Sequence, residues 1–356
     1  MRNHLTEREQ LVLYGLIRYP DLKDRELSEQ LGVKHSTLTS IRRRLQQKRY
    51  FRTIRLPYLQ HFGCELLAVI HTHFNPVIPL QKRVDITEEK IEAAEELFFS
   101  IGEFEKGFSL SLAENYTAIG KINDVRTETF GKLGLLEKNY PTEAIFPFAA
   151  SRIYRFFDYA PLIKNRFNLD GNPRCDFIWP PDHVHLSSTE RRVLYGLVKH
   201  PNESDKTLAA ILGVARQTVS RLRKQFEEQG YLAQMRIPNL RQLGFEILAF
   251  YHVRYDPANP PDFEEGEAAA LLSDNVIFMA SRPFETVIIA AYHTYGEYKA
   301  DKVEKMQMLK EREWIATNPV IRTYSLSKSE IIKDFTFAPI TKKILHVDDL
   351  PEHQQQ

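Results

Sequence analysis

The chain has 356 residues, of which 43% are hydrophobic and 27% charged, with a formal net charge of +1. This length exceeds the ~250–300 residues at which a single core stops growing, so we expect several globular domains and exclude a disordered chain, a fibre and a coiled-coil rod. Two cysteines are too few for a disulfide framework, and no apolar run approaches the ~18 residues of a membrane span. We therefore expect a cytoplasmic protein with no membrane segment.

The small net charge hides an uneven distribution of charged residues. Residues 1–60 contain 13 Lys and Arg against 6 Asp and Glu, and residues 186–242 contain 10 against 5, so the remainder of the chain is acidic. Two basic segments on an acidic remainder indicate a polyanionic partner such as a nucleic acid. Charged side chains that are merely solvated are the alternative.

The chain contains an internal repeat. Residues 5–76 align without a gap with residues 186–257, at an offset of 181, and residues 165–185, with Gly171-Asn172-Pro173 and Pro180-Pro181, form the linker. One unit is therefore written twice. The clearest matches are Val12-Leu13-Tyr14-Gly15-Leu16 with Val193-Leu194-Tyr195-Gly196-Leu197, Leu31-Gly32-Val33 with Leu212-Gly213-Val214, and, at an offset of 178, Phe157-x-Tyr159-Ala160-Pro161 with Phe335-x-Phe337-Ala338-Pro339.

Each copy begins with three predicted helices and an extended ribbon. In the first copy, the apolar spacing predicts a helix over Glu9–Ile17, Asp24 can cap a second helix, and Ser36 begins a third. The stretch Tyr50–Leu56 then reads as an extended ribbon. Two helices, a tight turn with glycine, a third helix and a ribbon make a winged helix-turn-helix, and the second copy repeats this order.

The rest of each copy alternates strands and helices. The order β-α-β-β-α-β is that of a ferredoxin-like sandwich, an antiparallel sheet with two helices on one face. We therefore predict an α+β fold with two repeats, each a winged helix-turn-helix followed by a ferredoxin-like effector domain. The expected strands and helices are 64–74, 87–100, 107–112, 116–122, 125–139 and 144–157 in the first copy, and 245–255, 263–272, 276–280, 285–293, 295–313 and 320–335 in the second.

These elements define the expected domain limits. The six segments are a first winged helix at 1–60, a first effector domain at 61–164, the linker at 165–185, a second winged helix at 186–241, a second effector domain at 242–346 and a flexible tail at 347–356.

The helix-turn-helix segments share a set of residues. In the first copy it is Glu26-Leu27, Leu31-Gly32-Val33, Ser36-x-Leu38, Leu45 and Leu59-x-x-x-Gly63, and in the second Leu208, Leu212-Gly213-Val214, Thr218, Phe226 and Leu240-x-x-x-Gly244. With the order of elements, this set resembles the leucine-responsive/asparagine regulator (Lrp/AsnC) family. The resemblance implies a transcription regulator that binds double-stranded DNA and pairs its effector domains. Because that family ordinarily carries one such unit per chain, the duplication predicts an intrachain pseudo-dimer. Whether a small molecule binds the effector domains, and whether pseudo-dimers pair further, stays open.

The third helix of each winged helix is expected to read DNA. Such a helix contacts base edges with its N-terminal residues, while nearby basic groups hold phosphates. Arg221 and Gln217 can pair with guanine and adenine, which Ser40 at the position of Arg221 cannot do, so the two modules should prefer different half-sites. The predicted DNA-binding residues are Ser36, Thr37, Ser40, Arg43, Arg44, Arg52 and Arg55 in the first copy and Arg216, Gln217, Thr218, Arg221, Lys224 and Arg236 in the second.

The first effector strand carries a recurrent pair of polar residues. Glu65 and His71 recur as Glu246 and His252, on one face of the strand because alternate residues share a face. They predict either a ligand or metal site where the effector domains meet, or a polar strand face where the sheets pair. A metal normally needs three or four converging ligands, which the sequence does not show, so we expect neither a metal nor a cofactor.

Two alternatives to the regulator remain. One is a winged-helix scaffold that binds protein or RNA. The other is an enzyme similar to the siroheme decarboxylases, which resemble Lrp/AsnC proteins and are recognised by a His-Asn-Tyr…Arg stretch and a Tyr-Asn-Leu-Trp-Phe strand. The corresponding strands here, residues 107–112 and 287–290, lack this signature. We therefore expect no enzymatic activity.

Overall fold

The computed structural model describes residues 5–91, 95–137, 140–170 and 183–348. Its contacts divide the chain into two compact units, unit 1 (Met1–Thr53, Ser151–Ile178 and Gln234–Ser327) and unit 2 (Ile54–Ala150, Trp179–Ala233 and Lys328–Gln356). Each unit combines the winged-helix helices of one copy with most of the effector domain of the other copy. The domain limits drawn along the repeat stay a prediction, and much of the expected linker and tail lies outside the described residues.

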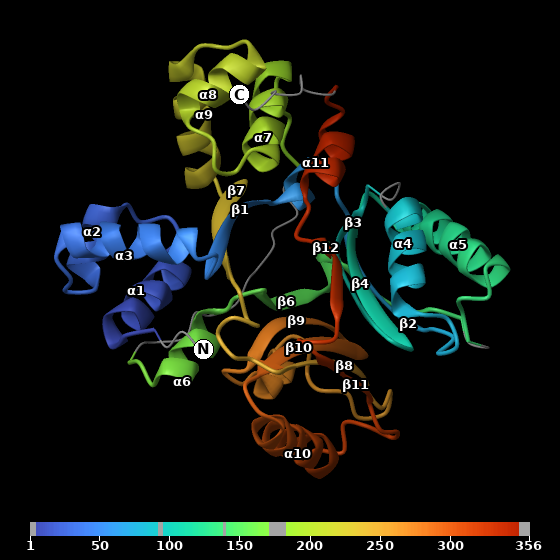
Figure 1. The fold of residues 1–356 in the computed structure, drawn as a ribbon. Coiled ribbons are helices and arrows are strands. Elements are labelled where there is room, and N and C mark those ends of the chain that lie inside the picture. Colours follow the sequence, from blue (N-terminus) through green and yellow to red (C-terminus); the bar gives the residue numbers. More distant parts are fainter. Residues whose placement is uncertain (1–4, 92–94, 138–139, 171–182, 349–356) are drawn as a thin grey trace. The chain divides into compact units, whose positions relative to one another are not determined.

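Each unit contains a three-helix head. In unit 1 it consists of α1 (Glu7–Arg18), α2 (Asp24–Gln30) and α3 (His35–Gln47), and in unit 2 of α7 (Ser188–Lys199), α8 (Asp205–Leu212) and α9 (Arg216–Glu228) (Figure 1). Helices α1 and α7 both begin with a capping box, formed by Thr6 with Glu9 and by Ser187 with Glu190. The box satisfies backbone N–H groups that would otherwise lack acceptors. The stripe Leu38, Ile41 and Leu45 of α3 is buried, as its spacing predicts.

The ribbon strands are shared between the copies. Strands β1 (Phe51–Pro57) and β7 (Leu232–Pro238) form a two-stranded sheet, and the division between the units crosses both strands. In unit 1 the backbone N–H of Asn239 donates to the carbonyl of Tyr50 at 2.8 Å, and in unit 2 that of Tyr58 donates to Tyr231 at 3.0 Å. These residues are equivalent in the repeat, so each head is bonded to the ribbon of the other copy.

The sheet of unit 2 has the predicted ferredoxin-like order. It is antiparallel, with the strand order β12-β3-β4-β2-β5. Helices α4 and α5 lie on one face of this sheet (Figure 1). The bounds are β2 (Leu66–His73), α4 (Leu80–Ile91), β3 (Leu97–Glu103), β4 (Lys106–Ala113), α5 (Tyr116–Lys132), β5 (Thr142–Pro147) and β12 (Glu330–Asp334).

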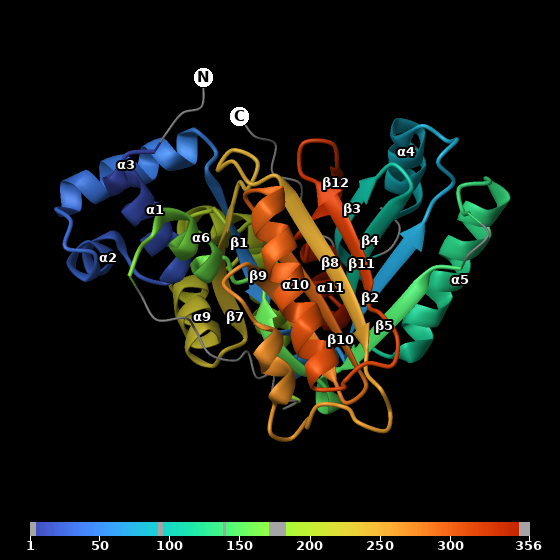
Figure 2. The same ribbon diagram turned by 90° about the horizontal axis from the view of Figure 1, so that it is seen from below.

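The sheet of unit 1 has the same arrangement, but the short 3-10 helix η3 (Glu267–Leu271) replaces the first of the two helices. The strand order is β11-β8-β10-β9-β6, and α10 lies across one face of the sheet (Figure 2). A core of Tyr251, Tyr292, Tyr298, Leu309 and Trp314 fills the space between them. The bounds are β6 (Arg152–Phe156), β8 (Ile247–Arg254), the 3-10 helix η3 (Glu267–Leu271), β9 (Val276–Arg282), β10 (Glu285–Tyr292), α10 (Tyr295–Glu311) and β11 (Val320–Ser325).

The two copies exchange their last strands. Strand β6 belongs to the first copy but pairs with β9 of the second, with Ile153 opposite Ala280. Conversely, β12 of the second copy pairs with β3 of the first, with Ile331 opposite Ile101. Short helices follow each exchanged strand, α6 (Ala160–Phe167) and α11 (Ala338–Leu345), with proline in the first turn, where its missing N–H costs nothing. Each sheet is thus completed by a strand from the other copy.

Several elements differ from the sequence-based assignment. The strands expected at 144–157 and 320–335 are each two strands, because in both places the chain leaves one sheet and enters the other. Residues 116–122 are the first half of α5 rather than a strand, since the Asn115 side chain caps that helix by accepting from the Ala118 N–H at 3.0 Å. The helix expected at 87–100 ends at Ile91, and the helix expected at 263–272 is reduced to the short η3. Within the described residues, none of the helices has the length and apolar character needed to cross a lipid bilayer.

Candidate nucleic-acid interface and effector residues

The predicted reading faces lie on the solvent side of α3 and α9. Thr37 and Thr218 are partly covered by the fold, and the other predicted side chains on both helices are exposed. The opposite faces are buried in the helical core, which holds each helix in a fixed orientation on its head. The exposed set is Ser36, Ser40, Arg43 and Arg44 on α3, and Arg216, Gln217, Arg221 and Lys224 on α9.

The N-termini of these two helices differ from those of the helices before them. Lys34 and Ala215 occupy the N-cap positions of α3 and α9, neither makes a side-chain cap hydrogen bond, and neither helix has an acidic residue in its first turn. By contrast, α1, α2, α7 and α8 all carry Asp or Glu in the first turn. An uncapped N-terminus without a carboxylate leaves backbone N–H groups and the positive end of the helix dipole available to an anion.

Equivalent Asp–Arg ion pairs hold α3 and α9, called here the reading helices, in place on their heads. Asp24 in unit 1 forms an ion pair with Arg42 at 3.2 Å and accepts a hydrogen bond from the Thr39 hydroxyl at 2.9 Å. The equivalent Asp205 in unit 2 pairs with Arg223 at 3.0 Å. Since each aspartate lies at the start of the second helix, the ion pair ties this helix to the third. This pair was not predicted from the sequence, although Asp and Arg recur at the same offset in both copies.

Arg44 and Arg221 are held by neighbouring side chains. Arg44 forms an ion pair with Glu9 at 2.8 Å. Burial alone would raise the pKa of Glu9, but hydrogen bonds from Thr6 and the Arg44 charge hold it below its usual value. In unit 2, Gln225 replaces Arg44 and accepts from the guanidinium of Arg221 at 3.3 Å. The hydrogen bond to Gln225 orients the guanidinium of Arg221, and the side chain stays accessible because it is exposed.

The predicted ribbon arginines are less accessible than expected. Arg55 is 6% exposed in unit 2, and burial, with the neighbouring charge of Arg223, lowers its pKa. Arg236 donates to the carbonyl of Leu16 at 2.6 Å in unit 1, and burial lowers its pKa to about 10. Arg52 is partly buried. Arg55 and Arg236 are therefore held against the heads.

The structure does not bring the paired effector residues together within either unit. Glu65 and Glu246 are exposed just before β2 and β8, whereas His71 and His252 are 2% exposed near the far ends of those strands. Six residues of strand span roughly 20 Å. His252 contacts the Glu285 carboxylate at 3.0 Å, and the first copy has Lys106 at the position of Glu285. Among the described residues, no three His, Cys, Asp or Glu side chains could hold a metal ion together.

Glu246 instead lines an open pocket of unit 1. The pocket has a volume of about 850 Å³ and includes residues of α1, the end of α6 and the turn before β8. Arg166, Arg241 and His293 line it together with Glu246. The pocket therefore adjoins the head of unit 1 rather than His252.

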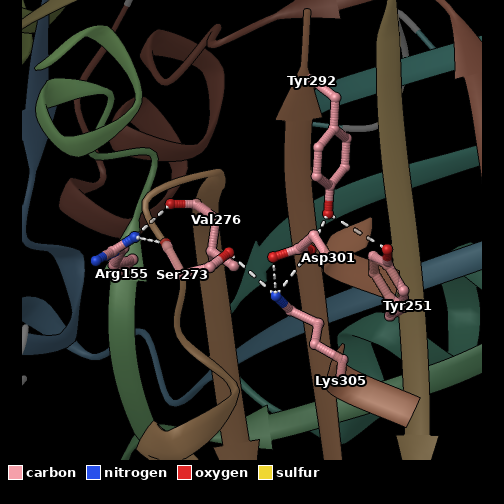
Figure 3. A network of polar contacts seen from close by, with 7 residues as sticks. All are labelled: Arg155, Tyr251, Ser273, Val276, Tyr292, Asp301 and Lys305. Atoms are coloured by element: carbon pink, nitrogen blue, oxygen red, sulfur yellow. Dashed lines mark hydrogen bonds and ion pairs between the residues drawn. The ribbon is translucent and has the colours of Figure 1, made fainter. Parts of the chain in front are cut away.

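A buried polar network occupies the space between β8, β10 and α10 (Figure 3). Lys305 on α10 lies 2.7 and 2.8 Å from the two carboxylate oxygens of Asp301 and donates to the Ser273 hydroxyl at 3.0 Å. The Tyr292 hydroxyl also donates to Asp301, and its oxygen is 3.3 Å from that of Tyr251. Burial lowers the pKa of Lys305, although Asp301 acts against this. The cation is thus neutralised within the unit.

These features define a protein with two winged helix-turn-helix heads and two ferredoxin-like sheets in one chain. Neither a protein-family model nor a curated protein matches the sequence. Among solved structures, the siroheme decarboxylase NirDL is similar over 96% of this chain and 99% of its own, with 13% identity and a TM-score of 0.48. AsnC of E. coli is similar over 39% of this chain and 93% of its own (18% identity, TM-score 0.32). The AsnC-family regulator PF0864 of Pyrococcus furiosus covers 41% of this chain and 90% of its own (23% identity, TM-score 0.32).

One sequence-based expectation is overturned by this comparison. The prediction that the chain is not an enzyme is contradicted by the likeness, over 96% of this chain, to a solved structure of an enzyme. The two strand segments that lack the expected signature, residues 107–112 and 287–290, lie on β4 and β10.

Proposed function

We propose that the protein is a transcription regulator that binds double-stranded DNA through α3 and α9 and recognises a site with two unlike halves. The observation that carries the proposal is the shared construction of the two reading helices. Each presents exposed polar and basic side chains from an uncapped, carboxylate-free N-terminus and is fixed by an equivalent Asp–Arg pair. Backbone N–H groups and arginines at such an end suit phosphate contact, and side chains of the first turns suit base contact.

The difference between the heads supports unlike half-sites. Arg221 is exposed on α9, and its guanidinium can donate twice to the O6 and N7 atoms of guanine. Ser40 occupies the same position on α3 and has a single hydroxyl. A protein with one chain can keep this asymmetry, whereas a homodimer of identical heads reads a symmetric site.

Fluorescence anisotropy with labelled duplex fragments at two salt concentrations tests the proposal. Arg43→Ala removes an exposed α3 cation and is expected to weaken binding and reduce the salt slope by about one. Lys121→Ala removes an exposed cation from α5 and serves as the matched control, with binding unchanged. Equal effects of the two variants, or tighter binding to RNA than to duplex DNA, would favour the interaction scaffold instead.

A further inference from the structure

Unit 2 contains a small pocket between its sheet and helices α4 and α5. Its volume is about 40 Å³, within a larger space of about 450 Å³ that includes open solvent. A water needs roughly 10–15 Å³ on this scale, so the inner part holds about three or four non-hydrogen atoms, enough for a carboxylate and the carbon next to it, and a short alkyl chain can continue into the larger space. The apolar side chains that line it include Ile70, Phe74, Leu80, Val84, Phe108 and Phe130.

Arg126 reaches this pocket from α5, and one nitrogen of its guanidinium lacks a hydrogen-bond partner among the described residues. The residue is 8% exposed, and its Nη1 donates to the Ser109 hydroxyl at 3.3 Å. Its Nη2 is buried and has no hydrogen-bond partner among the described residues. Burial lowers the pKa of Arg126 to about 10, although the charge of Glu143 acts against this. A buried cation without a bonded counterion is costly, and proteins normally pair it.

The equivalent position in unit 1 holds a buried cation that is paired with a carboxylate. Helices α5 and α10 have 17 residues each and begin at Tyr116 and Tyr295, which makes Lys305 the counterpart of Arg126. Lys305 is neutralised by Asp301, one helical turn earlier. In α5 the residue four positions before Arg126 is Ile122, so the first copy retains the buried cation without its carboxylate.

Other buried polar groups in the same layer of unit 2 are also unsatisfied. Both amide atoms of Asn123, three residues before Arg126 on α5, and the hydroxyl of Ser111 on β4 are buried without a hydrogen-bond partner among the described residues. Buried polar groups are almost always bonded to protein, water or a ligand. Asn123 and Ser111 do not line the pocket themselves, so the polar group that faces the pocket without a partner in the described part of unit 2 is the Nη2 of Arg126.

We propose that the pocket binds a short-chain monocarboxylate, with the carboxylate on Arg126 and the alkyl group among the apolar side chains. A carboxylate matches the planar guanidinium and supplies one negative charge, which balances the single buried cation. A dianion such as phosphate would leave a net buried charge, and its additional oxygens would face apolar walls. The site is separate from the reading helices, so the inference does not depend on DNA binding.

Sodium propionate is the probe, with sodium chloride at equal ionic strength as the reference. The full chain is expected to show saturation transfer to the propionate methyl group and a higher melting temperature in propionate than in chloride. Arg126→Met should weaken propionate binding roughly ten- to a hundredfold, the usual loss for a hydrogen bond to a charged group. Lys121→Met, an exposed cation on the same helix, should leave it unchanged.

A second variant tests the pocket without removing the charge. Val84 is 7% exposed and lines the cavity, so Val84→Phe should fill it and abolish the propionate response in a protein that keeps Arg126. If Arg126→Met fails to fold, Val84→Phe decides the question. The proposal is overturned if the wild-type chain shows neither saturation transfer nor a propionate-specific stabilisation. It is equally overturned if the folded variants respond as the wild type does.

Discussion

Lys305→Met should be among the most destabilising single changes in unit 1. Lys305 and Asp301 form an ion pair at 2.7 Å with side chains only 6% and 7% exposed. Removing the lysine leaves the Asp301 carboxylate buried with the Tyr292 hydroxyl as its remaining donor in the network. Breaking a buried pair from one side costs about 3–5 kcal/mol, because the orphaned charge is not returned to water. Equilibrium urea unfolding measures this loss, and hydrogen exchange of the β10 amides assigns it to unit 1.

Arg126→Met provides the matched comparison in unit 2. Arg126 occupies the same helix position but has no bonded carboxylate among the described residues, so its removal orphans no charge. We expect the free energy of unfolding to change by less than about 1 kcal/mol or to increase. A double variant, Lys305→Met with Asp301→Leu, should recover much of the stability lost in the single variant. Equal losses for Lys305→Met and Arg126→Met, or a loss below about 1 kcal/mol for Lys305→Met, would refute this reasoning.

Three further outcomes are expected. Glu9→Gln should flatten the acid side of the profile of stability against pH. The lowered pKa of Glu9 stabilises the fold at pH values above 4.5, and this contribution is lost as the pH falls through the folded-state pKa. Thermal unfolding between pH 3 and 6 measures the difference. Arg221→Ala should cost roughly 1–3 kcal/mol on a selected duplex and relax the preference at one base pair, whereas equal losses on selected and random duplexes would show that Arg221 only holds phosphate. Ile153→Asp places a charge at a 3% exposed position of β6 and should accelerate hydrogen exchange in β9 and β10, not in β2 and β4 of its own copy; acceleration in β2 would contradict the strand exchange.

The sequence predicted the elements whose determinants are local. The buried stripe of α3, the glycine turn after α8 and the β-α-β-β-α-β order follow from spacing and capping within a few residues. The strand exchange could not be read in this way, because residues 144–157 look the same whether they stay in one sheet or cross to another. Arg126 was missed because the segment 116–122 was assigned to a strand. Once α5 begins at Tyr116, Ile119, Arg126 and Phe130 fall on one buried helix face, and an arginine within that face is the signal.

In the candidate interface, the exposure of a side chain could be predicted where burial follows from the pattern of its own helix, and not where it depends on the other copy. The exposed residues of α3 and α9 follow from placing the apolar stripe inward, which leaves the polar side chains outward. The burial of the ribbon arginines could not be predicted from one copy alone, because it depends on the other copy's head, for instance on the carbonyl of Leu16 that accepts from Arg236. Glu65 and His71 share a strand face in the alternating pattern, but the distance along the strand separates them.

The most direct test of the central claim is selection of duplexes from a random library by the full chain, with Arg221→Ala selected in parallel. The account predicts an enriched site with two unlike half-sites, and for Arg221→Ala the loss of preference in one half-site while the other is retained. Failure to enrich any duplex, or enrichment of a site that Arg221→Ala leaves unchanged in both halves, would contradict DNA recognition by α3 and α9.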